Sequence, residues 1–289
     1  MNKLILLLSL CLLWSASDVY AQMVTVPEVG IVNDLENDSL LAAMGYVGLT
    51  EATPKILSPR TVSDAEFDRL LPRIKSLKLP LYACNIFIPR ELKVVGPKVD
   101  EAAVLEYVDV VFRRARAAGL TLITWGSGGS RQVPEGFSRL TATAQFIYMA
   151  GRVAEVAAKY DILLALENLN STECNFITSL PEALAVVRAV DHPNFRLCVD
   201  LYHMLMENEP AEVIAGTGPY AIYCEIAERE DRTPPGVHGD DFRPYFEQLK
   251  AEGYQGKIMI EARWKDLREQ GPEALRILRA QLAEVYSKP

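Results

Sequence analysis

Short apolar runs alternate with longer amphipathic segments along the chain. Eight of the runs are continuous and rich in Val, Ile, Leu and Tyr, which is typical of strands buried on both faces of a parallel sheet. The predicted strands are Glu28–Val32, Tyr46–Thr50, Leu79–Ile88, Leu120–Trp125, Ile162–Glu167, Phe195–Asp200, Ala221–Ala227 and Lys257–Glu261.

The segments between these runs have the spacing and the end signals of helices. Ser63 and Glu66 form a capping box at the start of one segment, and Gly119 follows another as a natural C-terminal residue. The predicted helices are Asp34–Met44, Ser63–Leu77, Asp100–Ala118, Ser138–Tyr160, Ser179–Val190, Asn208–Gly216, Asp240–Glu252 and Asp266–Tyr286.

This alternation predicts an α/β fold, a single-domain (β/α)8 TIM barrel. The chain shows no composition break or linker, and eight units of this length are the usual size of such a barrel. An open, doubly wound sheet is the structural alternative. It receives no support from a glycine-rich dinucleotide-binding motif.

The segment Met1–Ala21 has the pattern of a cleaved secretory signal. Lys3 precedes an apolar run, and the segment ends in Val19-Tyr20-Ala21. Cleavage there leaves residues 22–289 for the barrel and predicts an exported protein, periplasmic or secreted, without stable membrane insertion. An uncleaved anchor and a lipoprotein modified at Cys11 are alternatives. The apolar run is short for a membrane span, and Leu10 stands before Cys11 where a small residue is expected.

The net charge limits the possible binding partners, and the cysteine content bears on disulfide formation. The net charge of −8 argues against nucleic acid and anionic membranes as partners. The four cysteines after residue 21 contain no CxxC pair, and a free buried cysteine behaves as a small hydrophobe. The sequence therefore permits a disulfide in an exported protein without requiring one. It is also compatible with a homo-oligomer.

Acidic residues mark the last four predicted strands. Active-site residues of such barrels lie where strands end, and here those positions hold Glu167, Asp200, Glu225 and Glu261. Four carboxylates converging on one rim would raise one another's pKa unless a cation neutralised them. An all-oxygen set favours Mn²⁺ or Mg²⁺, with Zn²⁺ as a further candidate.

The segments around these acids carry a family resemblance. They are Glu167-Asn168, Asp200-Leu201-Tyr202-His203, Glu225-Ile226-Ala227-Glu228 with the following Arg232-Thr233-Pro234-Pro235-Gly236, and Ile260-Glu261. In order and spacing the set resembles the xylose-isomerase-like TIM-barrel superfamily, and within it the sugar isomerases and epimerases of the tagatose/psicose epimerase kind. The resemblance covers essentially the whole mature chain.

The resemblance implies one divalent metal and a proton-transfer pair. Its ligands would be Glu167, Asp200, Glu225 and Glu261, and Glu167 and Glu261 would also move a proton beside a carbonyl. His203, Glu228 and Arg232 would lie against the substrate.

One position departs from the family pattern, because Glu225 stands where the family usually has a metal-binding histidine. A carboxylate can still bind a hard metal, which then has lower Lewis acidity. Alternatively the site is altered or empty, or His238 from a nearby loop replaces the missing ligand.

Other polar and aromatic residues at strand ends are candidates for the pocket wall. Asn85 and Asn168 can donate to sugar hydroxyls, and Arg131 offers a planar donor fork. Trp125 or Trp264 could stack on a sugar face. The competing interpretations are barrel packing for the tryptophans and a loop salt bridge for Arg131.

These observations together predict a secreted, metal-dependent carbohydrate isomerase or epimerase that abstracts a proton next to a carbonyl of a small-molecule sugar. The same metal and acid/base residues would also serve a lyase or hydrolase that acts on 3-keto-glycosides. A non-catalytic sugar-binding barrel with a decayed metal site is a third hypothesis. A phosphodiesterase of the endonuclease IV kind needs more histidines than the three in this chain.

Overall fold

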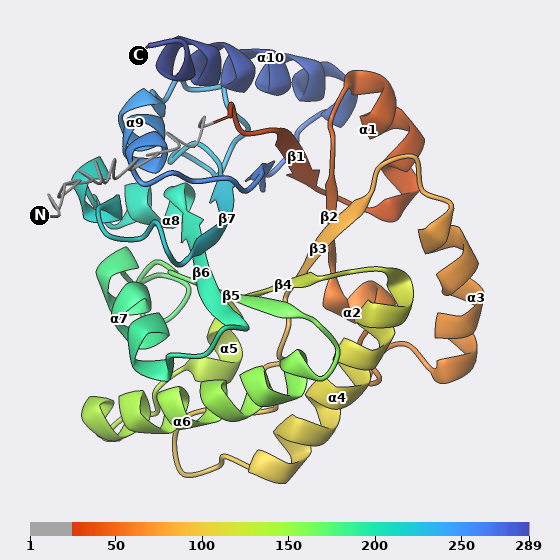
Figure 1. The fold of residues 1–289 in the computed structure, drawn as a ribbon, viewed down its shortest axis with the longest axis vertical. Coiled ribbons are helices and arrows are strands. Elements are labelled where there is room, and N and C mark those ends of the chain that lie inside the picture. Colours follow the sequence, from red (N-terminus) through yellow and green to blue (C-terminus); the bar gives the residue numbers. More distant parts are fainter. Residues whose placement is uncertain (1–24, 289) are drawn as a thin grey trace, which may run out of the picture.

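A closed barrel of eight parallel strands forms the centre of the molecule, which a computed structural model describes over residues 25–288. The strands follow one another around the barrel in chain order, and the last pairs with the first (Figure 1). They are β1 (Val29–Val32), β2 (Leu49–Ala52), β3 (Leu81–Asn85), β4 (Leu122–Trp125), β5 (Leu163–Glu167), β6 (Phe195–Asp200), β7 (Ala221–Ile226) and β8 (Ile258–Ile260). The predicted TIM barrel is confirmed.

The longer helices form a ring outside these strands (Figure 1). They are α1 (Asp38–Met44), α3 (Asp64–Lys75), α4 (Glu101–Ala118), α6 (Arg139–Ala158), α7 (Leu180–Val190), α9 (Arg243–Ala251) and α10 (Leu267–Tyr286). The signals read from the sequence set their ends. Ser63 and Glu66 make the capping box of α3, and Gly119 ends α4 in the left-handed conformation at φ 84°.

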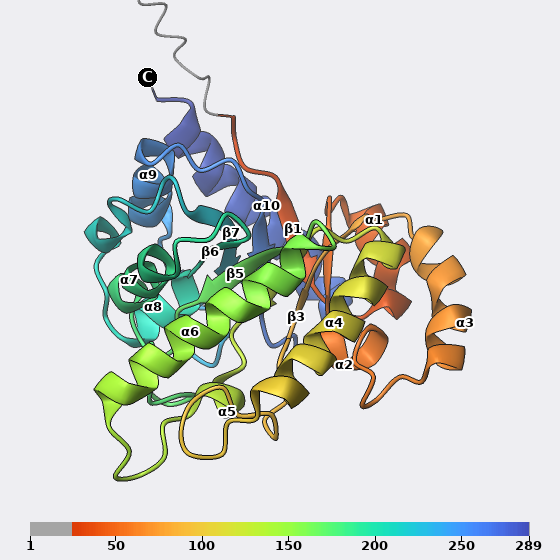
Figure 2. The same ribbon diagram turned by 60° about the horizontal axis from the view of Figure 1, so that its bottom comes forward.

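Shorter helical pieces lie in the loops. They are the α-helices α2 (Thr53–Ile56), α5 (Gly128–Arg131) and α8 (Leu201–Met206) and the 3-10 turns η1 (Leu35–Asn37) and η2 (Ala211–Ile214). The α-helices follow the C-terminal ends of β2, β4 and β6, the end at which barrel enzymes carry their active sites. In Figure 2, α2 and α5 lie at the lower side of the molecule.

The prediction of a helix over Asn208–Gly216 was wrong. Helix formation begins earlier, at Leu201, because the Asp200 side chain accepts a hydrogen bond from the His203 backbone N–H over 2.8 Å and caps α8. Asn208 then adopts a left-handed φ of 57°, and Pro210 precedes the short turn η2. Strand β3 is also shorter than predicted, since Ile86 leaves the extended conformation at φ 51°.

Two apolar layers hold the strands in place. Inside the barrel, Ala83, Leu122, Ala165, Cys198, Tyr223 and Met259 form one buried cluster. The larger core fills the space between the strands and the surrounding helices. Cys84, Cys174, Cys198 and Cys224 are buried and free, as expected for small apolar residues.

The predicted secretory signal, Met1–Ala21, lies outside the described residues and stays a prediction. Among the helices of residues 25–288, none is both long enough and apolar enough to cross a membrane.

Candidate active site

Strands β5 to β8 bring four carboxylates together at one end of the barrel. Glu167 ends β5, Asp200 ends β6, Glu225 lies near the end of β7 and Glu261 follows β8. One carboxylate oxygen from each lies within 4.8 Å of the others. Asp200 lies opposite Glu225 in the β6–β7 pair, whereas Glu167 lies opposite Cys198 and Glu225 opposite Met259, each two residues before the next acid along the chain. This is the convergence that the positions of the acids in the sequence predicted.

The cluster has the electrostatics of a cation site. Asp200 is fully buried, and its Oδ2 has no hydrogen-bond partner within the described part of the chain. Burial raises the pKa of Glu261 to about 7, with Arg232 opposing and Glu167 adding to the shift. Buried charges require a partner or a metal. Four clustered carboxylates, one of them with an oxygen that accepts no hydrogen bond from the described residues, therefore fit a hard divalent cation.

Glu225 is positioned from the interior of the barrel. The Tyr223 hydroxyl donates to Glu225 Oε1 over 3.2 Å, and it lies 2.7 Å from Thr50 Oγ1. Because side chains alternate along a strand, Tyr223 and Glu225 point to the same side of β7. Burial, followed by the charges of the other three acids, raises the pKa of Glu225 well above its usual range. Glu225 is thus directed into the acid cluster, where a cation would favour its charged form.

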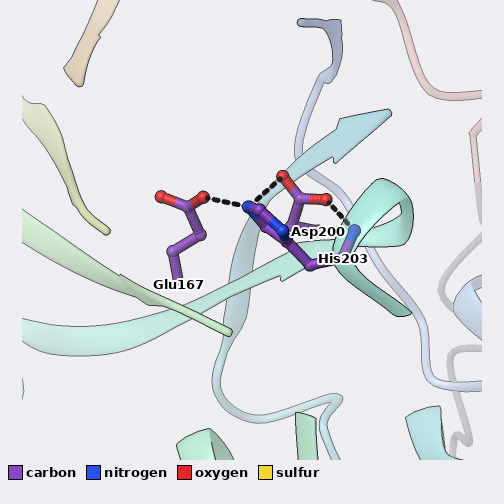
Figure 3. A group of neighbouring side chains, drawn as sticks. All are labelled: Glu167, Asp200 and His203. Atoms are coloured by element: carbon purple, nitrogen blue, oxygen red, sulfur yellow. Dashed lines mark hydrogen bonds and ion pairs between the residues drawn. The ribbon is translucent and has the colours of Figure 1, made fainter. Parts of the chain in front are cut away.

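His203 lies between two of the acids (Figure 3). Its Nε2 is 3.2 Å from Glu167 Oε1 and 3.8 Å from Asp200 Oδ2. Burial opposes protonation of the ring, but the charges of Asp200 and Glu167 prevail and raise the pKa of His203 to about 9. A proton on Nδ1, however, would meet a competing donor, because Asn170 Nδ2 lies 2.8 Å away.

The orientation of the Asn170 amide decides between these tendencies. Asn170 Oδ1 accepts from the backbone N–H groups of Thr172 and Glu173, at 3.0 and 3.1 Å. The amide oxygen is therefore committed, and the nitrogen faces His203. This arrangement assigns the neutral ring with its proton on Nε2, donating to Glu167.

Arg232 holds the second glutamate of the pair. Its guanidinium forms an ion pair with Glu261 and lies 4.5 Å over the Tyr202 ring. Asn85 Nδ2 donates to the other Glu261 oxygen over 2.8 Å. The same guanidinium reaches Glu173 Oε1 at 3.3 Å. Glu173 was missed in the sequence, where its only signal is an acid in the loop after β5.

A two-armed cleft opens onto these residues. Its arms have volumes of about 470 and 450 Å³ and share Asn85, Ile86, Arg232 and Glu261 as their divide. The first, the carboxylate arm, is also lined by Glu167, Glu173 and the loop 126–129. The second, the β1 arm, is also lined by Asn33, Asp34, Glu51, Lys55, Arg263 and Trp264. Each arm has the size of a site for one small ligand.

Three residues predicted to contact substrate instead support the protein interior. Trp125 is fully buried, and its ring packs edge-on against Phe87 and Phe195. The pocket role of Trp125 was therefore wrong, and the packing interpretation holds. Asn168 is also buried, and it bonds both backbone polar groups of Asp200, at 3.0 and 3.1 Å. It ties β5 to β6 and has no exposed face for a sugar.

Arg131 is the third of these residues. It is fully buried and donates to the backbone carbonyls of Trp125, Glu167 and Ile177 at 3.3, 2.8 and 3.4 Å. Neither of the two earlier interpretations, a substrate contact or a salt bridge, describes it. The guanidinium satisfies carbonyls at the ends of β4 and β5, and so it holds the backbone of Glu167 in place.

Glu228 organises the loop that follows β7. Its carboxylate accepts from the backbone N–H groups of Gly236, His238 and Gly239, at 2.7, 2.6 and 2.9 Å. It is fully buried, so the predicted substrate contact of Glu228 was wrong. The loop contains Arg232, whose position on Glu261 depends on this anchoring. The His238 ring itself groups with the exposed Glu230 and Asp231 and does not belong to the cluster of four acids.

We expect Glu228→Gln to lower the free energy of unfolding by about 2 kcal/mol, because the amide offers fewer acceptors to buried N–H donors. Amide hydrogen exchange at Gly236 and Gly239 should accelerate in the variant. The matched control is Glu230→Gln in the same loop, whose side chain is 71% exposed and should change neither measurement. Equal protection in both variants would contradict the anchoring role.

Comparisons with known proteins agree with this geometry. A family model described as a xylose isomerase-like TIM barrel matches residues 39–281. A Mus musculus protein with the provisional name hydroxypyruvate isomerase is 28% identical over 172 residues, which cover 56% of this chain and 61% of that protein. A ketose 3-epimerase of Arthrobacter globiformis is 32% identical over 113 residues, 39% of each chain. The chain thus matches less than two thirds of the length of these curated relatives.

Among solved structures, the apo form of a 3-keto-D-glucoside 4-epimerase from E. coli superposes with a TM-score of 0.74. The two sequences are 20% identical, and the match covers 88% of this chain and 99% of the other. At this identity the likeness shows a common fold.

Proposed function

This chain belongs to the xylose isomerase-like TIM-barrel family, and from that premise we propose that it is a metal-dependent carbohydrate isomerase or epimerase. The observation that carries the proposal is the pair Glu167 and Glu261, two carboxylates that line the same arm of the cleft and belong to the cluster of four acids. Proton transfer next to a carbonyl needs one group that removes a proton and one that returns it.

The two glutamates are held differently, which suits them to different roles. Glu167 Oε1 accepts a hydrogen bond from the Nε2–H of the neutral His203 ring, which fixes that carboxylate oxygen. Glu261 is held by Arg232 and Asn85, and a bound cation would favour its charged form, the form that can accept a proton from carbon. We propose that one takes a proton from the sugar carbon and the other delivers it to the product. Arg232, between Glu261 and Glu173, would bind a sugar hydroxyl.

A divalent cation would be held by Glu167, Asp200, Glu225 and Glu261, and it would polarise the substrate carbonyl and acidify the neighbouring C–H. The oxygen-only set supports Mn²⁺ or Mg²⁺, and Glu225 in place of a histidine supports these over Zn²⁺. Among the described residues, the buried Oδ2 of Asp200 accepts no hydrogen bond and has His203 Nε2 3.8 Å away, which supports a cation in the cluster over a decayed site.

We expect Mn²⁺ to raise the melting temperature of the purified protein. At 100 times the dissociation constant, binding to the folded state alone contributes about 2.7 kcal/mol of stability. Glu225→Gln should lose most of this shift, because the amide supplies a neutral and weaker ligand. Asp231→Asn is the control, since Asp231 belongs to an exposed acidic group outside the cleft. The absence of a shift with Mn²⁺, Mg²⁺ and Zn²⁺ would contradict the cation site.

The function is tested by hydrogen exchange into sugars. The protein is incubated with Mn²⁺ in heavy water with D-fructose, D-psicose, D-tagatose, L-ribulose and hydroxypyruvate, and deuterium is followed by NMR at the carbons beside the carbonyl. Exchange without net turnover still reports proton abstraction. Exchange in none of these compounds would overturn the proposed acid/base function.

We further propose that the protein is exported, on the basis of the signal pattern in Met1–Ala21. The expected mature N-terminus is Gln22. N-terminal sequencing of protein recovered from the periplasm or medium of expressing cells tests this. A full-length chain retained in the cytoplasm or membrane fraction would contradict it.

A further inference from the structure

The proposed chemistry uses only one arm of the cleft. The carboxylate arm is lined by both Glu167 and Glu261, so the reacting sugar belongs there. The β1 arm meets the acid pair only at Glu261, on the divide. Its volume of about 450 Å³ nearly equals that of the carboxylate arm, and it is large enough for a ligand group of its own. A single monosaccharide bound in the carboxylate arm would leave the β1 arm unfilled.

Adjacent strands build the β1 arm. Asp34 follows β1, Lys55 lies in α2 after β2, and Arg263 and Trp264 follow β8. Because β8, β1 and β2 are neighbours in the closed barrel, these loops form one continuous wall beside the acid cluster. Ile86, which is 54% exposed in a left-handed conformation, stands at the divide between the arms.

The charges of the β1 arm balance one another. Its wall contains three carboxylates and three cationic side chains, which are Asp34, Glu51, Glu261, Lys55, Arg232 and Arg263. The Lys55 ammonium is already paired with Asp34 and lies 3.6 Å from Glu51. Arg232 is likewise paired with Glu261. Arg263 has no ion pair within the described part of the chain, so an anionic group such as a phosphate would meet one available guanidinium among three carboxylates.

A neutral group with many hydroxyls fits this wall better. Carboxylates accept from hydroxyls, and ammonium and guanidinium groups donate to them. Trp264 adds a half-buried aromatic side chain to the wall, and part of it packs against the hydrophobic core. An indole beside mixed donors and acceptors is an amphipathic surface of the kind that a sugar ring, with apolar C–H faces and polar edges, can contact.

We propose that the β1 arm is a subsite for a second, uncharged sugar residue that is linked to the reacting sugar in the carboxylate arm. The preferred substrates are then keto-sugar glycosides, over free monosaccharides and sugar phosphates. This assignment rests on the proposed function, because that function places the reacting sugar beside Glu167 and Glu261.

Binding to the Mn²⁺-loaded protein tests the subsite by calorimetry. The probes share a fructose unit: D-fructose itself, the disaccharides lactulose, maltulose and isomaltulose, and fructose 6-phosphate. At least one disaccharide should bind about tenfold more tightly than fructose, since it fills both arms. Fructose 6-phosphate should show no such gain. Deuterium exchange into fructose is measured on the same samples.

The variant Trp264→Leu distinguishes the loss of a specific subsite from a general weakening of sugar binding. We expect it to weaken the best disaccharide about tenfold more than it weakens fructose. Tyr148→Leu is the control, because Tyr148 is an aromatic residue of α6 that is 58% exposed and lies outside both arms.

The outcomes distinguish the two proposals. Disaccharides that bind no better than fructose, or not at all, overturn the subsite, and so does a gain confined to fructose 6-phosphate. A disaccharide preference that Trp264→Leu leaves intact also overturns this placement of the second sugar. In each case, exchange into fructose leaves the proposed function standing. The proposed function fails if no compound in its own panel exchanges.

Discussion

Glu261→Gln is expected to lower deuterium exchange into the substrate about 10³-fold while the barrel remains folded. The amide has nearly the same shape and can still accept from Asn85 Nδ2, which donates to Glu261 over 2.8 Å. It cannot accept a proton from carbon, and it loses the ion pair with Arg232. The exchange rate by NMR is the measurement, with the protein loaded with Mn²⁺.

The control for this variant is Glu273→Gln, a surface glutamate of α10 that is 53% exposed. It removes the same charge far from the cleft and should leave exchange unchanged. Melting with Mn²⁺ separates two ways in which Glu261→Gln can act. A retained Mn²⁺ shift with lost exchange identifies Glu261 as an acid/base group, whereas loss of both assigns the effect to the cation. Exchange within tenfold of the wild-type rate would contradict both roles.

The sequence predicted the barrel because its strands and helices carry strong local signals. The capping box at Ser63 and the glycine at the end of α4 act within a few residues, so they can be read without tertiary context. The helix after β6 was misplaced because its start depends on Asp200, a residue expected to serve the site alone. Its side chain caps α8 as well, and so the helix begins directly at the strand end.

The acid cluster was also readable, since barrel topology alone brings the ends of β5 to β8 together. The roles of Arg131 and Glu228 could not be predicted from the sequence. Each role depends on which backbone groups of the folded chain lie within hydrogen-bond distance of the side chain. Arg131 donates to Ile177, 46 positions away in sequence. Glu228 gathers N–H groups from a loop whose path no local pattern predicts. Polar residues just beyond a strand can therefore serve the loop as easily as the ligand.

The glycine that follows β4 leaves room for the Glu167 carboxylate, which the amino-acid sequence alone did not reveal. Gly126 lies in the wall of the carboxylate arm without a left-handed backbone. An added Cβ would overlap Glu167 Oε2, and it would also lie 3.0 Å from the carboxyl carbon. Gly126→Ala should therefore displace the Glu167 carboxylate while the backbone tolerates alanine. We expect deuterium exchange to fall about 10²-fold, the cost of misplacing a catalytic group by about 1 Å.

Gly151→Ala is the matched control, because a Cβ at this position in α6 meets nothing within 4 Å. It should leave exchange unchanged and slightly stabilise the helix. The double variant Gly126→Ala/Glu167→Asp tests the cause, since aspartate is shorter by one methylene and withdraws the carboxylate from the new methyl group. If the steric account is right, the second substitution costs much less activity in the Gly126→Ala background than it does alone. If the losses of exchange activity from the two substitutions are simply additive, Gly126 affects exchange by some means other than the position of Glu167.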